Sequence, residues 1–185
     1  GMQESLPDLH SYVYSEEMVA LVSAANEASF FFENLNEVDA RMFIETSVIH
    51  LASVYRSILD VGETQPVYES PVEPHVTEQD WAALYQRIAT MLGRHNEILR
   101  PAEEGEFDRS DLVTHSISED IADIYQELRD FTFVYSRGME ELMNDAAWDL
   151  KERFAEHWGK KLLRALSALH DLRVAGINPE EEENV

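Results

Sequence analysis

The chain has 185 residues, a length that suits one domain with a core large enough to fold without disulfides or bound metal. Its 37 acidic and 14 basic residues give a formal net charge of −23, which argues against binding to nucleic acid or anionic membranes. There is no Cys, which excludes disulfides, thiolate metal sites and a cysteine nucleophile, and weakly favours the cytoplasm.

The sequence shows no segment that would direct the chain to a membrane. The N-terminus has no basic region followed by an apolar stretch, so no signal peptide is expected. No apolar run approaches the roughly 20 residues that a transmembrane helix needs. Gly1 before Met2 is typical of a cleaved purification tag, and residues 1–10 are expected to be flexible. We therefore expect a cytoplasmic protein.

Helical periodicity begins near Ser15, with Glu16 and Glu17 in the first turn, and continues to about Leu35. A second predicted helix runs from about Asp39 to Asp60, with an apolar stripe at helical spacing. Residues 61–76 then contain three prolines, which exclude a helix and favour extended chain. We expect this segment to cross the bundle.

The third predicted helix begins at Thr77 as N-cap, with Asp80 in its first turn. Residues 93–114 form a second irregular stretch, without an alternation long enough to build a sheet. The fourth helix follows the N-cap Ser116 and stops at Gly138.

The fifth predicted helix runs from about Met139 to Val174 and is apolar on two sides, which is typical of a helix in the middle of a bundle. Gly159 inside it costs about 1 kcal/mol relative to Ala. Either this glycine lets a neighbouring helix approach closely, or the helix bends or breaks there. The second, narrower apolar set consists of Trp148, Ala155, Gly159 and Leu163.

These elements predict an all-α fold. Residues 1–185 are expected to form a single-domain helical bundle of about five main helices with two long irregular crossings, 61–76 and 93–114. Residues 178–185 contain a run of like charges and are expected to be flexible. No internal repeat is visible.

The fourth helix carries a row of carboxylates that could either bind a divalent cation or face the solvent. Di-iron bundles use a Glu-x-x-His pair on each of two helices, and this chain contains no such pair. A solvent-exposed face is therefore the interpretation we favour, and we predict no metal ion and no cofactor. The carboxylates are Glu119, Asp120, Asp123, Glu127 and Asp130.

No catalytic motif is visible in the sequence. The seven His residues include no pair at zinc-site spacing, and there is no Gly-rich phosphate loop, Gly-x-Ser-x-Gly elbow or HExxH. His50 and His157 flank apolar stripes, a position more typical of a structural His than of a base or ligand. We assign no catalytic residue and favour a protein that is not an enzyme.

The fifth helix holds a basic row within this acidic chain. Its members share one helical face and span about 16 Å. The cations either neutralise the protein's own acidic helices, at about 0–1 kcal/mol per exposed pair, or dock an acidic partner or anionic ligand. We favour neutralisation. If the row instead docks a partner or ligand, it is the candidate interaction face of the protein. The row consists of Arg153, His157, Lys160 and Arg164.

Two segments of the chain resemble a bacterial family. They are SEDIADIYQELRDF, residues 118–131, and FAEHWGKKLLRALSALH, residues 154–170. The family is the domain of unknown function numbered 5063, and the resemblance implies a soluble, helical bacterial protein. It carries over no catalytic residue, because the family has no assigned activity.

Three functions remain open. The leading hypothesis is a non-enzymatic module that binds a protein partner, because catalytic motifs are missing and charge is concentrated. The alternative is an enzyme or small-molecule binder with a pocket between the fourth and fifth helices, lined by Tyr125, Trp148 and His157. A nucleic-acid mimic is a weaker third hypothesis, since −23 on a small domain resembles a phosphate array. A concave pocket with converging polar groups would favour a ligand binder, and a flat exposed patch would favour a protein partner.

Overall fold

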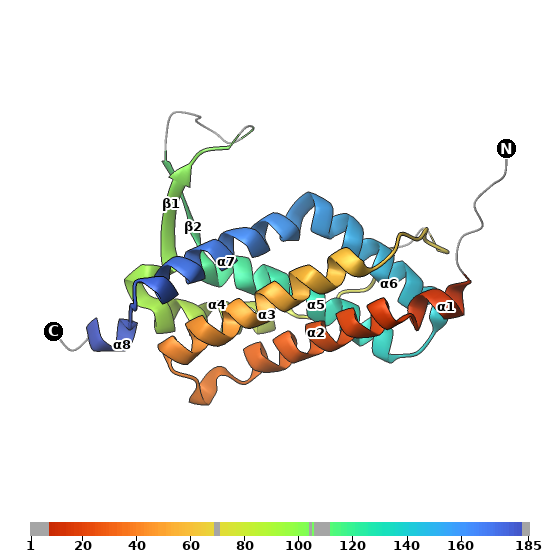
Figure 1. The fold of residues 1–185 in the computed structure, drawn as a ribbon, viewed down its shortest axis with the longest axis horizontal. Coiled ribbons are helices and arrows are strands. Elements are labelled where there is room, and N and C mark those ends of the chain that lie inside the picture. Colours follow the sequence, from red (N-terminus) through yellow and green to blue (C-terminus); the bar gives the residue numbers. More distant parts are fainter. Residues whose placement is uncertain (1–7, 69–70, 104, 106–111, 183–185) are drawn as a thin grey trace.

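Helices make up most of the computed structural model, which describes residues 8–68, 71–103, 105 and 112–182 (Figure 1). The all-α prediction is confirmed. None of the described helices is long and apolar enough to cross a membrane. The elements are α1 (Leu9–Val13), α2 (Glu16–Glu33), α3 (Ala40–Asp60), α4 (Glu78–Leu92), β1 (Glu97–Pro101), β2 (Leu112–Ser116), α5 (Ile117–Ser136), α6 (Glu140–Arg153), α7 (Gly159–Val174) and α8 (Pro179–Glu182). Short helical turns lie at Leu35–Glu37, Gly93–Asn96 and Phe154–Trp158.

Polar N-caps start the helices where the sequence predicts them. The side chains of Ser15, Asp39, Thr77 and Ser116 each accept a hydrogen bond from a backbone N–H in the first turn of the helix that follows. At α4 the Asp80 carboxylate also accepts from the Thr77 N–H, which completes a capping box. The caps satisfy N–H groups that have no partner within the helix.

Helix α5 lies at the centre of the bundle and packs against α2, α4, α6 and α7. Its residues Ile117, Ile121, Ile124 and Leu128 are fully buried. The second apolar set predicted for the fifth helix is not a buried face, because Leu163 is 45% exposed. Helix α7 instead packs against α3 and α5 and leaves this side open.

The fifth predicted helix is divided into α6 and α7 by the π-helical turn Phe154–Trp158. The Gly159 N–H donates to the Phe154 carbonyl, which closes the wider turn. A Cβ atom on Gly159 would lie 2.6 Å from that carbonyl oxygen, closer than Cβ atoms come in proteins. The glycine is therefore required by the interruption of the helix, which was one of the two alternatives.

Replacing Gly159 by Ala is expected to lower the free energy of unfolding by about 1–3 kcal/mol, because the added carbon meets a backbone oxygen that has little freedom to move. Helix propensity alone predicts the opposite sign, a gain of about 1 kcal/mol. Urea denaturation measures the difference. Gly62→Ala is the control, because a Cβ there meets no atom within 4 Å. A Gly159→Ala protein as stable as the original would contradict the assigned role.

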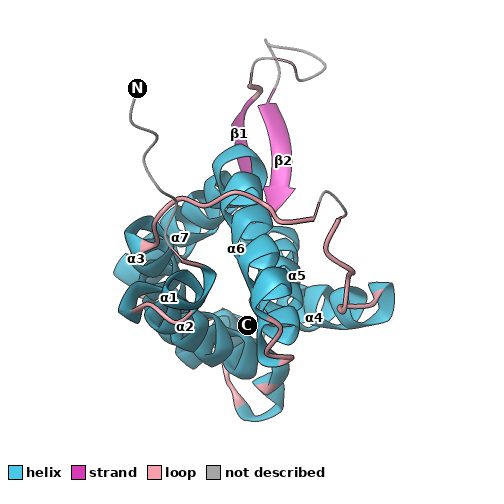
Figure 2. Cartoon of the chain, turned by 90° about the vertical axis from the view of Figure 1, so that its right-hand side faces the viewer, coloured by secondary structure: helices cyan, strands magenta, loops and turns pink. Residues whose placement is uncertain are grey.

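Residues 93–114, predicted to be irregular, contain a β-hairpin that stands off the end of the bundle (Figures 1 and 2). Strands β1 and β2 pair antiparallel, with Ile98 opposite His115 and Arg100 opposite Val113. These four side chains are half-buried, and Leu99 and Thr114, which alternate with them, are exposed. The prediction of a second irregular crossing is wrong here, because charged residues occupy inward positions and hide the apolar alternation.

The described part of the 61–76 segment crosses the bundle as extended chain, as its prolines predict (Figure 2). Polar side chains of α6 hold it in place. The backbone N–H groups of Val67 and Tyr68 donate to the Asp145 carboxylate at 2.6 and 2.8 Å. The neighbouring Asn144 accepts from a threonine hydroxyl of the segment and donates to one of its carbonyls.

Helix α1, close to the N-terminus, packs against α6, far along the chain. The Tyr135 hydroxyl, at the end of α5, donates to the Val13 carbonyl of α1 at 2.7 Å. The contacts of α1 therefore include residues more than a hundred positions later in the sequence.

The acidic tail forms a helical turn, α8, that contacts α3 and α4. The Glu180 carboxylate accepts a hydrogen bond from the N–H of Ala40, the first residue of α3, at 3.2 Å. The run of like charges predicts a flexible tail, whereas Pro179 is buried and Glu182 contacts the turn before β1. Residues 1–7 and 183–185, which share the prediction of flexibility, lie outside the described residues.

Candidate functional site

The carboxylate row of α5 does not face the solvent as a whole, so the favoured interpretation of that row is wrong. Glu119 is exposed, but Asp120 is buried and Asp123 and Glu127 are half-buried. These three carboxylates pair with cations on the next two helices, which joins α5 to α6 and α7. The pairs are Asp120–Arg164 at 3.2 Å, Glu127–Arg153 at 2.6 Å, and Asp123–Lys161.

The basic row predicted on the fifth helix lies along one cavity of about 410 Å³ beside α5. All four of its members line that cavity, together with Lys161, which the prediction left out. Pairing with the protein's own carboxylates is observed for Arg153, Lys160 and Arg164. His157 is 59% exposed and lies 3.7 Å from Glu156, and no contact of this residue indicates a ligand.

The structure does not bring Tyr125, Trp148 and His157 around one cavity of the described residues. Tyr125 donates through its hydroxyl to Glu33 of α2 at 3.0 Å, and burial together with this carboxylate raises its pKa. It lines a cavity between α2 and α4, whereas His157 lines the cavity beside α7. Trp148 is half-buried on α6.

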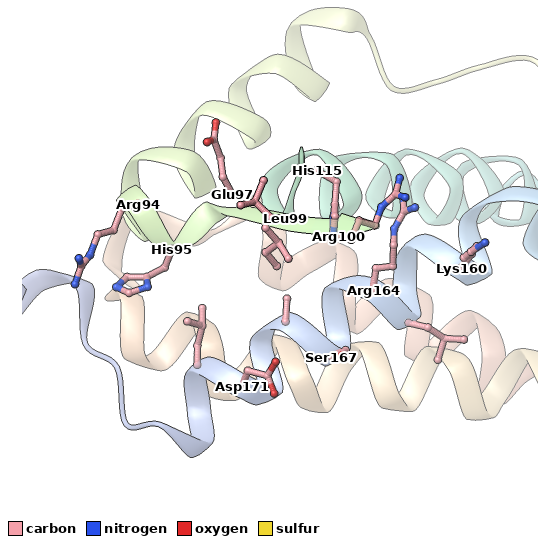
Figure 3. A pocket seen from close by; sticks show the side chains of 14 residues that line it. Arg94, His95, Glu97, Leu99, Arg100, His115, Lys160, Arg164, Ser167 and Asp171 are labelled. Atoms are coloured by element: carbon pink, nitrogen blue, oxygen red, sulfur yellow. The ribbon is translucent and has the colours of Figure 1, made fainter. Parts of the chain in front are cut away.

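The largest of these hollows lies elsewhere, between the hairpin β1–β2 and α7. We call it the hairpin cleft; its volume is about 710 Å³ (Figure 3). The side chains of Ile98, Leu163 and Leu172 form apolar parts of its walls. Its basic residues come from four elements and are Arg94, His95, Arg100, His115, Lys160 and Arg164.

The cleft gathers basic side chains in a protein that has few of them. Four of the chain's 14 Lys and Arg residues line it, against two carboxylates, Glu97 and Asp171. Figure 3 shows two basic ends: Arg100, Lys160 and Arg164 at one, and Arg94 with His95 at the other. An anionic group in the cleft would meet donors from more than one direction.

A buried ion cluster supports the Arg164 end of the cleft. The Asp120 carboxylate, 3% exposed, lies 3.2 Å from Arg164 and 3.2 Å from Nδ1 of His115. Burial raises the pKa of Asp120, although Arg164 and His115 oppose the shift. Nε of Arg164 is buried and has no hydrogen-bond partner among the described residues. The cluster therefore fixes the positions of His115 and Arg164 in the wall of the cleft.

Carboxylates of the chain itself sit at both ends of the cleft. At one end Glu182 of α8 lies 2.7 Å from His95 Nε2 and 3.0 Å from Arg94, and these contacts lower its pKa. At the other end the Glu103 carboxylate, next to the hairpin, pairs with Lys160. That hydrogen bond, with smaller contributions from the nearby arginines, lowers the pKa of Glu103.

Sequence reasoning identified Lys160 and Arg164 but missed the residues opposite them. Arg100 and His115 belong to strands that were not predicted, and Arg94 and His95 belong to the turn before β1. The signal that could have found them is the clustering of basic residues on both sides of a short irregular stretch. In the part of the chain that the structure describes, no three His, Asp or Glu side chains are grouped as metal ligands.

Comparison with known proteins places the chain in a family. A crystal structure of protein BF1032 from Bacteroides fragilis is similar, with a TM-score of 0.78 and 28% identity, covering 88% of this chain and 95% of that one. A search of curated proteins found no match. The profile described as "Domain of unknown function (DUF5063)" matches residues 12–175, which include both walls of the hairpin cleft. The chain therefore belongs to the DUF5063 family.

Proposed function

We propose that this protein is a non-enzymatic interaction module that binds an acidic segment of a partner protein in the hairpin cleft. The observation that carries the proposal is the gathering of basic side chains around one hollow in a chain of net charge −23. Carboxylates of the chain itself already occupy both ends of the hollow, which supports an acidic ligand.

The length of the cleft favours a peptide segment over a small ion. Its α7 wall extends from Lys160 to Leu172, which is about 18 Å at 1.5 Å per residue. An extended chain of about five or six residues spans that distance. Leu99, 66% exposed, and Leu163 offer apolar contacts between the two basic ends. A segment with acidic residues at its ends and apolar residues between them matches this order.

The contacts of His115 give no support to a catalytic role. Its Nδ1 is tied to Asp120, an arrangement that also orients catalytic bases. Among the described residues, however, no Ser, Thr or Tyr hydroxyl is hydrogen-bonded to this His and ready to be activated. A small anionic ligand is the second candidate, since about 710 Å³ lies within the range of small-molecule pockets.

Fluorescence anisotropy with a labelled peptide of sequence Glu-Glu-Leu-Glu-Glu-Leu tests the proposal. We expect saturable binding that Arg100→Gln and Lys160→Gln each weaken by about tenfold, because each change removes a charge-assisted hydrogen bond. Arg56→Gln is the matched control, because this arginine is 79% exposed on α3. The proposal fails if the peptide does not bind, or if all three variants bind it as the original protein does.

A further inference from the structure

We infer that the Lys160 end of the hairpin cleft is a phosphate subsite, so that the partner segment carries a phosphorylated side chain. This inference rests on the proposed function and names its ligand more closely. The subsite is formed by Lys160 and Arg164 of α7, Arg100 of β1 and His115 of β2.

The position of Glu103 marks where an anionic group is held. Its carboxylate is hydrogen-bonded to Nζ of Lys160. The charges of Arg100 and Arg164 also act on it and contribute to its lowered pKa. The three cations come from both walls of the cleft, and Figure 3 shows the two guanidinium groups at the same end. A group from a partner would find the same cations around the same place.

The charges of three cations, Lys160, Arg100 and Arg164, act on the place that the Glu103 carboxylate occupies. A carboxylate brings one charge and two oxygens, whereas a phosphate monoester brings about −1.5 to −2 and three acceptor oxygens. Guanidinium groups bind phosphate oxygens in pairs, and a phosphate therefore matches this donor set better than Asp or Glu does.

A buried carboxylate that holds two of the basic side chains distinguishes this end of the cleft from a surface cluster of lysines. The buried Asp120 carboxylate contacts both Arg164 and His115, whose side chains are 22% and 10% exposed. Because these two side chains are held in place, little conformational entropy is lost when they bind a ligand. Phosphorylated segments are commonly recognised by such preorganised arginines.

Glu103 then competes with the ligand for the same cations. The incoming phosphate must displace this carboxylate from Lys160. Removing its charge is therefore expected to strengthen phosphopeptide binding by about threefold to tenfold. Glu152→Gln removes the same charge from an exposed position on α6, away from the residues that line the cleft, and is the matched control.

The test uses three labelled peptides of sequence Glu-Glu-Leu-X-Glu-Leu, in which X is Ser, Glu or phosphoserine. Fluorescence anisotropy measures the binding of each peptide to the full chain. We expect the phosphoserine peptide to bind at least about tenfold more tightly than the Glu peptide. Glu103→Gln should increase its affinity, and Glu152→Gln should not. Phosphorus NMR of the bound peptide should show a shift of the phosphoserine signal that Arg100→Gln diminishes.

The outcomes separate the two proposals. If no peptide binds, the proposed function fails. If the Glu peptide binds as tightly as the phosphoserine peptide, or if Glu103→Gln has no effect, the phosphate subsite is overturned and the acidic-segment module stands. If free O-phosphoserine binds as tightly as the phosphopeptide, a protein segment is excluded as the source of the phosphate.

Discussion

Replacing Arg164 by Met is expected to lower the free energy of unfolding by about 3–5 kcal/mol, because it leaves the buried Asp120 carboxylate without its guanidinium partner. The reciprocal change, Asp120→Asn, is expected to cost only about 1 kcal/mol. The amide keeps an oxygen that accepts from Arg164, and Arg164 itself is 22% exposed and has access to water.

The direction of the Asp120 pKa shift supports this difference. Burial raises the pKa of the carboxyl, and Arg164 and His115 only partly oppose the shift, so the site disfavours the negative charge. A neutral amide removes a charge that burial already disfavours. The loss of Arg164 removes the principal compensation and leaves the unfavourable group in place.

Urea denaturation of both variants measures the two costs. Arg173→Met, an exposed arginine on the same helix, is the matched control and should change stability by less than about 0.5 kcal/mol. Equal costs for Asp120→Asn and Arg164→Met would show that the ion pair itself, and not an uncompensated charge, determines stability at this position.

The pH dependence of the same variants has a defined sign. A carboxyl whose folded-state pKa is raised gives its full stabilisation below the unfolded-state value of 3.8, and loses it as the pH rises through the folded-state value. The stability of the original protein relative to Asp120→Asn should therefore fall over the interval in which the pH rises from about 4. A rise over that interval would contradict the assignment.

Asp145→Ala is the second change with a large expected effect, about 2–3 kcal/mol of lost stability. It deprives the N–H groups of Val67 and Tyr68 of the acceptor that fixes the crossing segment on α6. Asp145 is 5% exposed, so water does not easily take the place of the carboxylate. Asp145→Asn retains one acceptor oxygen and should cost about half as much.

Urea denaturation measures the change in the free energy of unfolding. Hydrogen exchange measures the protection of the Val67 and Tyr68 amides themselves. Both amides should exchange faster in Asp145→Ala. Asp149→Ala, about one turn later on α6, is the control, because burial raises the pKa of Asp149 and its charge is disfavoured there. If the two alanine variants were equally stable, the hydrogen bonds of Asp145 would have no net effect.

Local signals in the sequence predicted where helices begin. Ser15, Asp39, Thr77 and Ser116 cap helices because a short side-chain oxygen reaches the free N–H groups of the first turn, and this depends on neighbouring residues alone. The prolines of the 61–76 segment likewise act on their own backbone. Such features need no knowledge of distant contacts.

The interruption of the fifth helix has a weaker signature. A π-helical turn uses residues that also suit an ordinary helix, and Gly159 was its sole visible mark. The sequence therefore raised the alternative without deciding it. The decision depends on the carbonyl of Phe154, whose position follows from packing.

The candidate site was the part least visible in the sequence. Strand prediction relies on inward apolar residues, and here Arg100 and His115 point inward, toward a cleft that also holds Arg164. The pairing of the α5 carboxylates with the cations of α6 and α7 was hidden for a related reason. Each row looks solvated on its own helix, and only the approach of the helices shows that they meet.

The contact between α1 and α6 has a consequence for how the chain acquires its structure. The Tyr135 hydroxyl, which donates to the Val13 carbonyl, and the residues of α6 follow α1 by more than a hundred positions. Contacts between residues so far apart along the chain form slowly, and we expect α1 to dock late in folding.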